Sequence, residues 1–499
     1  MSPTEENFSE SENVELSPES ALLEDDQSAE VAPTKSHRNK IIAVLVGLVL
    51  VVVLAGAWAF TQLSGGGKQP EEFLPYDTVA FAKVDLNPSA AQKINFIRFI
   101  SQFHHSFKNF NSGDPVGSIV KSLNVKGTSD WDQIKPWIGN RFAVAGVDGP
   151  NGVAPVGILA VSNQSEMAYY FAKHATGIKY IYKSGYVLIA DNQGVLDIMA
   201  AAPKHLSENQ TFTADVKALG ISPVVLAWAD VKQLAKSGTA ALNSLTQDAG
   251  IDSLTGTIDK LQGRLVFGVH FTPKSVSAVF LTRDSGLSAN SFTTKRTDIS
   301  NLPINTLAGV SIAGLGESIA KALSDNGQAS TVSDLGLSLA ELKQLLSGPL
   351  SIVVLPGATA KETPLLAVKL SPTQPAAAIK IVRNVVDGNF LLSGLASQIK
   401  LVGNDIYIGT DAKALAAVIK SVNDSKQHLS DSGSFRSVIP APGFFQGFLN
   451  IKDILTYVNS TGSFNDLGDL MNFSFLGLSS SADSSTPGGT KTLLSLSLK

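Results

Sequence analysis

Two serine–lysine pairs have the spacing of a penicillin-interacting serine site. Ser118-Ile119-Val120-Lys121 and Ser397-Gln398-Ile399-Lys400 both read S-x-x-K, and Ser324-Asp325-Asn326 reads S-D-N. The first pair precedes the S-D-N run, the second follows it, and K-T-G does not occur in the chain. These residues therefore do not form the set that serine acylation requires, and the sequence predicts no catalytic residue.

Cofactor and metal chemistry have equally weak support. Gly314-Leu315-Gly316 follows a predicted strand, but residue 319 is isoleucine where a dinucleotide-binding loop needs glycine or alanine. The chain has no cysteine, which excludes thiolate catalysis and Cys-ligated zinc. His104 and His105 are adjacent on a predicted helix and cannot both face one ion. We predict no cofactor and no metal, and a protein that is more plausibly a binding protein than an enzyme.

A cluster of tyrosines is a better indication of binding. Five of the eight tyrosines lie between residues 169 and 186: Tyr169, Tyr170, Tyr180, Tyr182 and Tyr186. Tyr180 and Tyr182 are two residues apart on a predicted strand and share a face. Tyr180, Tyr182 and Tyr186 are the predicted binding platform, on which a sugar ring could stack or a partner could dock. The alternative is packing of these rings beneath the helix that carries Tyr169.

Matched sequence blocks suggest how these residues are positioned. Leu74 to Ala80 matches Leu302 to Ala308, and residues 206–212 match residues 429–435. We interpret residues 73–284 and 300–499 as two copies of one unit, joined by a linker at 285–299. Helical stretches alternate with hairpin-connected strands, so the predicted fold class is α+β: two homologous units of mainly antiparallel sheet with flanking helices, preceded by one transmembrane helix.

The predicted transmembrane helix is Ile41 to Phe60, twenty uncharged residues that would span the roughly 30 Å hydrocarbon layer. Basic residues precede it, at positions 35, 38 and 40, while the first charge after it is Lys68, so the positive-inside rule puts the N-terminus in the cytoplasm and the body outside. The alternative is a cleaved signal peptide, since Ala55-Gly56-Ala57 fits a small-x-small cleavage pattern.

Residues 1–40 read as a disordered acidic cytoplasmic tail, and residues 61–72 as a Gly-rich spacer. The tail has ten acidic side chains and no Lys or Arg in its first 34 residues. Its serine and threonine hydroxyls are hypothetical phosphoacceptors.

The opening L-P-Y-D-T-V-A-F-A-K-V-D-L-N-P-S-A-A-Q-K (residues 74–93), the anchored topology and the duplicated body resemble a family of bacterial membrane-anchored proteins classed as a domain of unknown function. The resemblance implies an envelope protein and carries no catalytic residues over to this chain.

The expected function is therefore that of a non-enzymatic, single-pass protein of the cell envelope whose extracytoplasmic body binds a protein partner or an envelope ligand. The alternative is a carrier of a lipid or other apolar small molecule, for which a large apolar cavity would be evidence. A third hypothesis is a hydrolase with no linear motif. A net charge of -4 and a near-neutral body give no expectation of nucleic-acid binding.

Overall fold

The computed structural model describes residues 67–100, 131–149, 152–174, 178–237, 262–285, 295–333, 336–357, 359, 362, 364–388, 398–424, 428–460, 471–483, 485–486 and 488–499. We refer to residues 67–285 as the first half and to residues 295–499 as the second half. The elements of the first half are η2 (Pro70–Glu72), β1 (Ala80–Asp85), α2 (Ala90–Ile100), α4 (Trp131–Ile134), β2 (Ile138–Gly149), β3 (Gly152–Val161), α5 (Gln164–His174), β4 (Lys179–Lys183), β5 (Tyr186–Ala190), α6 (Gln193–Ala201), η3 (Leu206–Glu208), α7 (Gln210–Ala218), β6 (Val225–Asp230), α8 (Val231–Ser237), β7 (Arg264–Phe271) and β8 (Ser275–Arg283).

The elements of the second half are β9 (Ala308–Ile312), α12 (Leu315–Asp325), α13 (Ala329–Ser333), α14 (Leu339–Leu345), β10 (Leu350–Leu355), β11 (Leu365–Leu370), α15 (Pro375–Gly388), β12 (Ile399–Val402), β13 (Asp405–Gly409), α16 (Ala412–Asn423), η6 (Leu429–Asp431), α17 (Gly433–Val438), β14 (Phe445–Asn450), α18 (Ile451–Ser460), β15 (Phe473–Asp483) and β16 (Gly489–Leu498).

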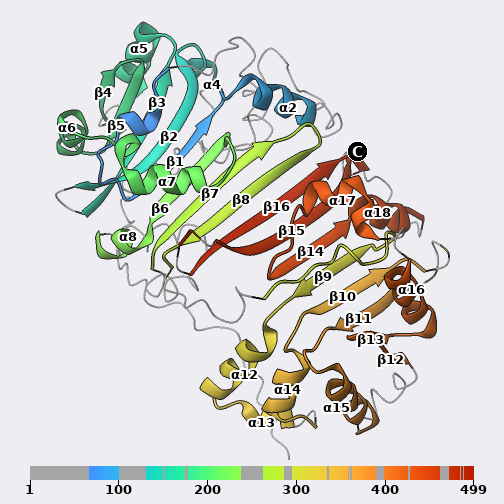
Figure 1. The fold of residues 1–499 in the computed structure, drawn as a ribbon. Coiled ribbons are helices and arrows are strands. Elements are labelled where there is room, and N and C mark those ends of the chain that lie inside the picture. Colours follow the sequence, from blue (N-terminus) through green and yellow to red (C-terminus); the bar gives the residue numbers. More distant parts are fainter. Residues whose placement is uncertain are drawn as a thin grey trace, which may run out of the picture.

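All of these strands belong to one antiparallel sheet of 16 strands (Figure 1). Its order is β12-β13-β11-β10-β9-β14-β15-β16-β8-β7-β6-β1-β2-β3-β5-β4. The halves meet where β8 pairs with β16, along Ser275–Thr282 and Thr490–Ser497. Counted outward from this pair, the strands of the first half follow the order β8-β7-β6-β1-β2-β3-β5-β4, and those of the second half follow the corresponding order β16-β15-β14-β9-β10-β11-β13-β12. The two halves therefore have the same topology.

The predicted architecture, two homologous units of mainly antiparallel sheet with flanking helices, preceded by one transmembrane helix, is wrong. The β8–β16 ladder joins both halves into a single sheet, because each strand offers an edge that the other satisfies. None of the helices in the described ranges is long and apolar enough to cross a membrane. The segment Ile41 to Phe60, the tail before it and the phosphoacceptor hypothesis lie outside those ranges.

Local sequence signals predict a hairpin turn at Ser184-Gly185 and helix caps at Asp191 and Asp411. The structure confirms the turn and the cap at Asp411. The turn at Ser184 and Gly185 joins β4 to β5, and both residues have positive φ (51° and 84°), as a two-residue hairpin turn requires. Asp411 caps α16 by accepting a hydrogen bond from the Ala414 N–H (2.8 Å). In the first half the cap of α6 is Asn192 and not the preceding Asp191.

The matched sequence blocks are explained by hydrogen bonds that recur at corresponding places. In each Leu-Pro opening a threonine hydroxyl donates a hydrogen bond to the proline carbonyl three residues earlier. In each, the leucine carbonyl also accepts a hydrogen bond from the backbone N–H of a leucine in a later 3-10 turn. The donors and acceptors are Thr78 to Pro75 (2.7 Å) and Thr306 to Pro303 (2.6 Å), then Leu206 to Leu74 (2.9 Å) and Leu429 to Leu302 (2.8 Å). These motifs therefore hold the fold together.

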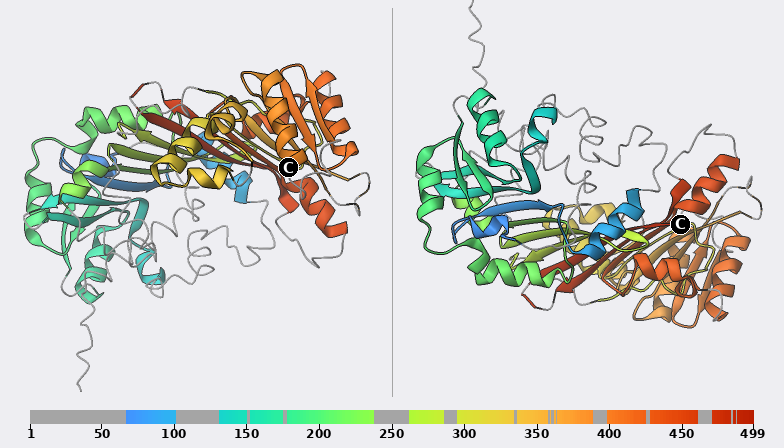
Figure 2. Two further views of the ribbon diagram at one scale, coloured as in Figure 1. Left: turned by 90° about the horizontal axis from the view of Figure 1, so that it is seen from below. Right: turned by 90° about the horizontal axis from the view of Figure 1, so that it is seen from above.

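The sheet has two differently covered faces, both visible in the views of Figure 2. On the face that we call closed, α6 and α7 cover the first half and α16 and α17 the second, over two large apolar cores. On the face that we call open, α2, α4 and α5 cover the first half, and α15 covers the outer strands of the second. The centre of the open face lies between these two groups of helices.

The segment before β1 is fixed to the closed face. The Lys68 carbonyl accepts a hydrogen bond from the Tyr186 hydroxyl (2.6 Å), and Lys83 forms an ion pair with Glu71 (2.6 Å). Pro70 is buried. Residues 67–72, the end of the predicted spacer, are thus packed against the sheet.

A half-buried histidine on the closed face predicts how stability depends on pH. Burial lowers the pKa of His270, which a hydrogen bond with the backbone of Ser277 offsets in part. Because the unfolded chain then binds a proton more readily than the folded chain, stability rises with pH and is lost as the pH falls below about 6.5. We expect His270→Asn to reduce the difference between urea midpoints measured at about pH 7.5 and about pH 5. An unchanged difference would show that other groups determine it.

Candidate functional site

The centre of the sheet has its polar and apolar faces reversed. In β8 and β16, serines alternate with aliphatic residues, which usually means that the serines face water. Here Ser275, Ser277, Ser495 and Ser497 are buried, while Leu494 is 43% exposed. Folding has therefore placed hydroxyl groups inside the protein and left hydrocarbon side chains outside.

The buried hydroxyls are tolerated because they bond to one another. Ser277 Oγ and Ser495 Oγ lie 2.7 Å apart across the β8–β16 pair, and Ser311 Oγ lies 2.7 Å from Ser351 Oγ across β9 and β10. Thr297 also bonds to Ser311. A polar group that keeps a hydrogen-bond partner can be buried at little cost. These buried hydroxyl groups on the closed face therefore have hydrogen-bond partners without any ligand.

The opposite side of the same strands forms what we call the central apolar face. Its members share one side of the sheet in register across β8, β16, β15, β14, β9, β10 and β11. They are Phe280, Val310, Ile352, Val354, Leu366, Leu449, Leu476, Leu478 and Leu494. Phe280, Ile352, Leu366, Leu449 and Leu494 are each exposed, although large contiguous apolar patches are uncommon on protein surfaces that face only water.

A groove of about 360 Å³ lies on this face. Leucines from β14, β15 and β16 line one side, and Val310, Ile352 and Val354 from β9 and β10 line the other. Helices α2 and α18 stand on the same side of the sheet in Figure 2 (blue, and red-orange beside the C label), and no residue of either helix lines the groove. No charged side chain lines it among the described residues. It can bind an apolar molecule by excluding water, but it offers no acid, base or nucleophile.

The predicted tyrosine platform is only partly brought together. Tyr180 and Tyr182 are exposed on one side of β4, an edge strand of the sheet, and the Tyr180 ring packs 4.5 Å from that of Phe171. Tyr186 lies on the buried strand β5 and is 5% exposed. Burial raises the pKa of its phenol to about 12. Tyr186 is therefore a core residue, and a platform on this edge consists of Tyr180 and Tyr182.

The other chemical motifs remain apart. The S-D-N run lies at the end of α12, and Lys400 lies on β12 at the edge of the second half. The first S-x-x-K pair and Ser397 lie outside the described residues. Gly314 has a positive φ (76°) at the start of α12, which accounts for its glycine. Within the described ranges, no group of three His, Asp or Glu side chains could hold a metal ion.

Sequence reasoning missed the central apolar face. A signal was present in the alternation of leucine and serine in residues 494–498, which indicates a strand with two different faces. The pattern alone cannot say which of the two faces the helices will cover.

Comparisons with known proteins supply no family. No protein-family model matches the chain, and no curated protein matches it. Two crystal structures of a protein named TP0453 are similar to it. Crystal form I is 8% identical with a TM-score of 0.20, covering 72% of this chain and 99% of that one. Crystal form III is 10% identical with a TM-score of 0.15, covering 71% and 99%. Similarities this low support no argument about fold or function.

Proposed function

We propose that this protein binds the hydrocarbon chain of a lipid on the central apolar face. The observation that carries the proposal is the reversed burial at the sheet centre, where serines are inside and leucines outside. Exposing leucines costs roughly 25 cal/mol for each Å² of apolar surface left in water. A ligand that covers them recovers this free energy.

The chemistry of the groove favours a hydrocarbon chain over a peptide. Every strand beneath the groove is paired on both sides, so its backbone cannot accept an added β-strand. Protein interfaces depend mainly on Trp, Tyr and Arg, whereas leucine and valine are under-represented among their strongest contacts. The lining consists of Leu, Ile and Val together with one Ala, one Phe and two Gly, and it has no side chain that could orient a polar ligand.

The size of the groove also fits an acyl chain. Five adjacent strands, β10, β9, β14, β15 and β16, line it, and at about 4.8 Å per step they span roughly 19 Å. One acyl layer fills about 15 Å, half of the hydrocarbon core of a bilayer. The volume of about 360 Å³ lies within the range of about 300–1,000 Å³ found for small-molecule sites.

The wider predictions of a cell-envelope location and of a protein partner stay predictions. An envelope location would give the groove access to membrane lipids. The exposed pair Tyr180 and Tyr182 is the surface on which partner binding should be sought first.

Titration of the full-length protein with hexadecanoate, a saturated fatty acid, tests the proposal. We expect saturable binding in the wild type and a Kd about tenfold weaker or more for Leu494→Gln, because burial of one leucine contributes about 1.5–3 kcal/mol. Isothermal titration calorimetry below the concentration at which the fatty acid aggregates measures both values.

Leu401→Gln is the matched control. Leu401 is 37% exposed and lies on β12 at the edge of the sheet, outside the central apolar face. The control should bind hexadecanoate like the wild type. Absence of saturable binding in the wild type, or equal weakening by both substitutions, would contradict the proposal.

A further inference from the structure

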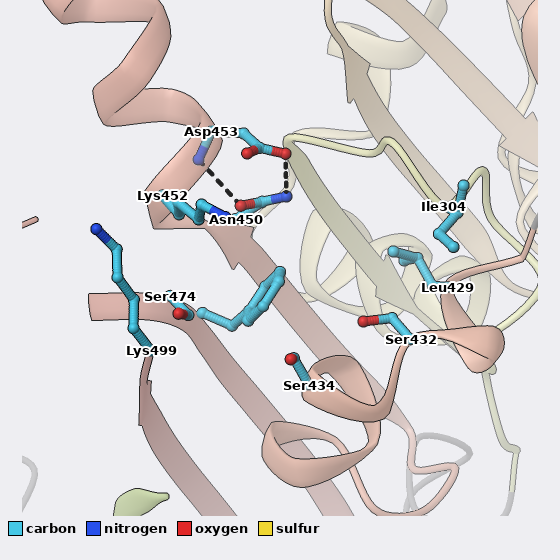
Figure 3. A pocket seen from close by; sticks show the side chains of 10 residues that line it. Ile304, Leu429, Ser432, Ser434, Asn450, Lys452, Asp453, Ser474 and Lys499 are labelled. Carbon is cyan, nitrogen blue, oxygen red and sulfur yellow. Dashed lines mark hydrogen bonds between the residues drawn. The ribbon is translucent and has the colours of Figure 1, made fainter. Parts of the chain in front are cut away.

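A second, polar pocket of about 480 Å³ lies at the end of the second half (Figure 3). The first turn of α18, the start of α17, the beginning of β15 and Lys499 surround it. Its lining includes three hydroxyl groups, from Ser432, Ser434 and Ser474, and two cationic side chains, from Lys452 and Lys499. No residue of the central apolar face lines it, so the inference below does not depend on the lipid proposal.

Ser474 is the most informative member of this lining. It is 6% exposed and sits at a β-bulge, where the pairing of β15 with β16 shifts register between Phe473 and Phe475. A bulge redirects a side chain out of the regular alternation of a strand. In Figure 3 its hydroxyl, like those of Ser432 and Ser434, is turned toward the pocket. None of the described residues provides Ser474 Oγ with a hydrogen-bond partner, so a ligand in the pocket would supply one.

The start of α18 adds backbone donors. Helix α18 has ten residues, and its first N–H groups form the positive end of the helix dipole. Asn450 Oδ1 accepts from the Asp453 N–H (3.1 Å), but no described residue accepts from the N–H of Ile451. At the corresponding place in the first half, the Val231 N–H donates to the Gly263 carbonyl (3.0 Å). The second half thus leaves open a donor that the first half satisfies internally.

The charges around the pocket favour an anion. Two lysine side chains, Lys452 and Lys499, line the pocket with one side-chain carboxylate, that of Asp453, and this carboxylate already accepts a hydrogen bond from Asn450 Nδ2 (2.7 Å). Lysine ammonium groups, serine hydroxyls and a helix N-terminus all donate hydrogen bonds, and together they match a group with several acceptor oxygens. We infer that this pocket binds a phosphate group, carried by a small soluble ester or by a lipid headgroup.

Binding of inorganic phosphate to the full-length protein, followed by isothermal titration calorimetry, tests the inference. We expect saturable binding that Lys452→Met weakens about tenfold. Lys232→Met is the matched control, because Lys232 is the second residue of α8 as Lys452 is of α18, and both are exposed. The control should bind phosphate like the wild type. No saturable binding in the wild type, or equal weakening by both variants, would overturn the inference.

Ser474→Ala separates a binding role from a structural one. Removing a buried hydroxyl that has no partner should leave the urea midpoint unchanged or slightly higher, while the phosphate affinity falls several-fold. A lower midpoint with unchanged affinity would assign Ser474 to the fold and count against the site. Vesicles containing phosphatidic acid then distinguish the two sources. Vesicle binding that free phosphate displaces indicates a lipid headgroup, and phosphate binding without vesicle binding indicates a soluble ester.

Discussion

Replacing Asp215 with alanine is expected to lower the free energy of unfolding by about 3–5 kcal/mol. Asp215 on α7 is 1% exposed, and its carboxylate accepts hydrogen bonds from Trp228 Nε1 (2.9 Å) and Arg264 Nε (2.6 Å). Arg283 Nε lies 3.1 Å from the same carboxylate. Without Asp215, the buried guanidinium of Arg283 loses its nearest negative charge, and that desolvated charge accounts for most of the expected loss. Urea unfolding followed by far-UV circular dichroism measures it.

Asp284→Ala provides the comparison, because Asp284 pairs with the same arginine. Arg264 Nη1 lies 2.8 Å from Asp284 Oδ2, but Asp284 is exposed. Exposed ion pairs contribute about 0–1 kcal/mol, so this variant should unfold close to the wild-type midpoint. Equal losses from the two substitutions would contradict the importance that we assign to burial.

The arginine that pairs with Asp215 also contacts the second half of the sheet. Arg283 is the last residue of β8, and its Nη2 donates to Ser485 Oγ (2.8 Å) just after β15. Its Nη1 lies 3.9 Å from Asp483. Asp215 thus orients a side chain that reaches the second half, and its loss should weaken the β8–β16 junction as well as the first-half core.

Replacing Gly263 with alanine is expected to destabilise the protein by roughly 3 kcal/mol or more. Gly263 precedes β7 and has a φ of +87°, a conformation that costs an L-residue about 1–2 kcal/mol. A Cβ at this position would also lie 2.1 Å from the Arg283 carbonyl oxygen and 2.3 Å from that of Asp284. Both are backbone atoms, so the chain must shift and the neighbouring Arg264 shifts with it. Urea unfolding again gives the loss.

Gly185→Ala isolates the contribution of the contact. Gly185 has nearly the same φ, +84°, but nothing lies within 4 Å of the added Cβ. This variant should lose only about 1 kcal/mol. If Gly263→Ala lost no more than Gly185→Ala, the close approach to the Arg283 carbonyl would have no energetic importance.

Sequence reasoning succeeded where a structure is determined by neighbouring residues. The hairpin turn at Ser184 and Gly185 and the helix ending at His174 follow from turn residues and periodicity within a few positions. The cap at Asp411 is equally local. Start positions are less accurate. The pair Asn87-Pro88 predicts a helix capped by Asn87. Helix α2 begins only at Ala90, so Asn87 lies outside it and its side chain accepts a hydrogen bond from Lys93.

The joining of the halves could not be predicted in this way. The pairing of β8 with β16 depends on which edges remain free after each half has formed, and no short window of sequence contains that information. The matched blocks suggested two units, but equal element order does not tell whether the sheets stay separate or merge. In the structure the sheets merge, because residues 275–282 of β8 pair with residues 490–497 of β16.

The two candidate sites were hidden for different reasons. Leu449 and Leu494 look like core residues in the sequence, and only the arrangement of the helices shows that they are left uncovered. The polar pocket depends on a register shift at Ser474 and brings together Lys499 and the start of α18. Lys499 and α18 are far apart in the sequence, so no short motif indicates the pocket. In contrast, Tyr180 and Tyr182 were found because residues two apart on a strand share a face.

The position of β16 has a consequence for synthesis of the protein. Residues 275–283 leave the ribosome long before residues 489–498. Strand β8 therefore has no partner on its outer edge until β16 has been synthesised. An exposed edge of this kind pairs readily with other chains, and contacts between distant segments form slowly. During this interval the nascent protein is at its most prone to aggregate, and a chaperone that shields β8 would protect it. Once β16 pairs with β8, this edge is no longer exposed and the protection is no longer needed.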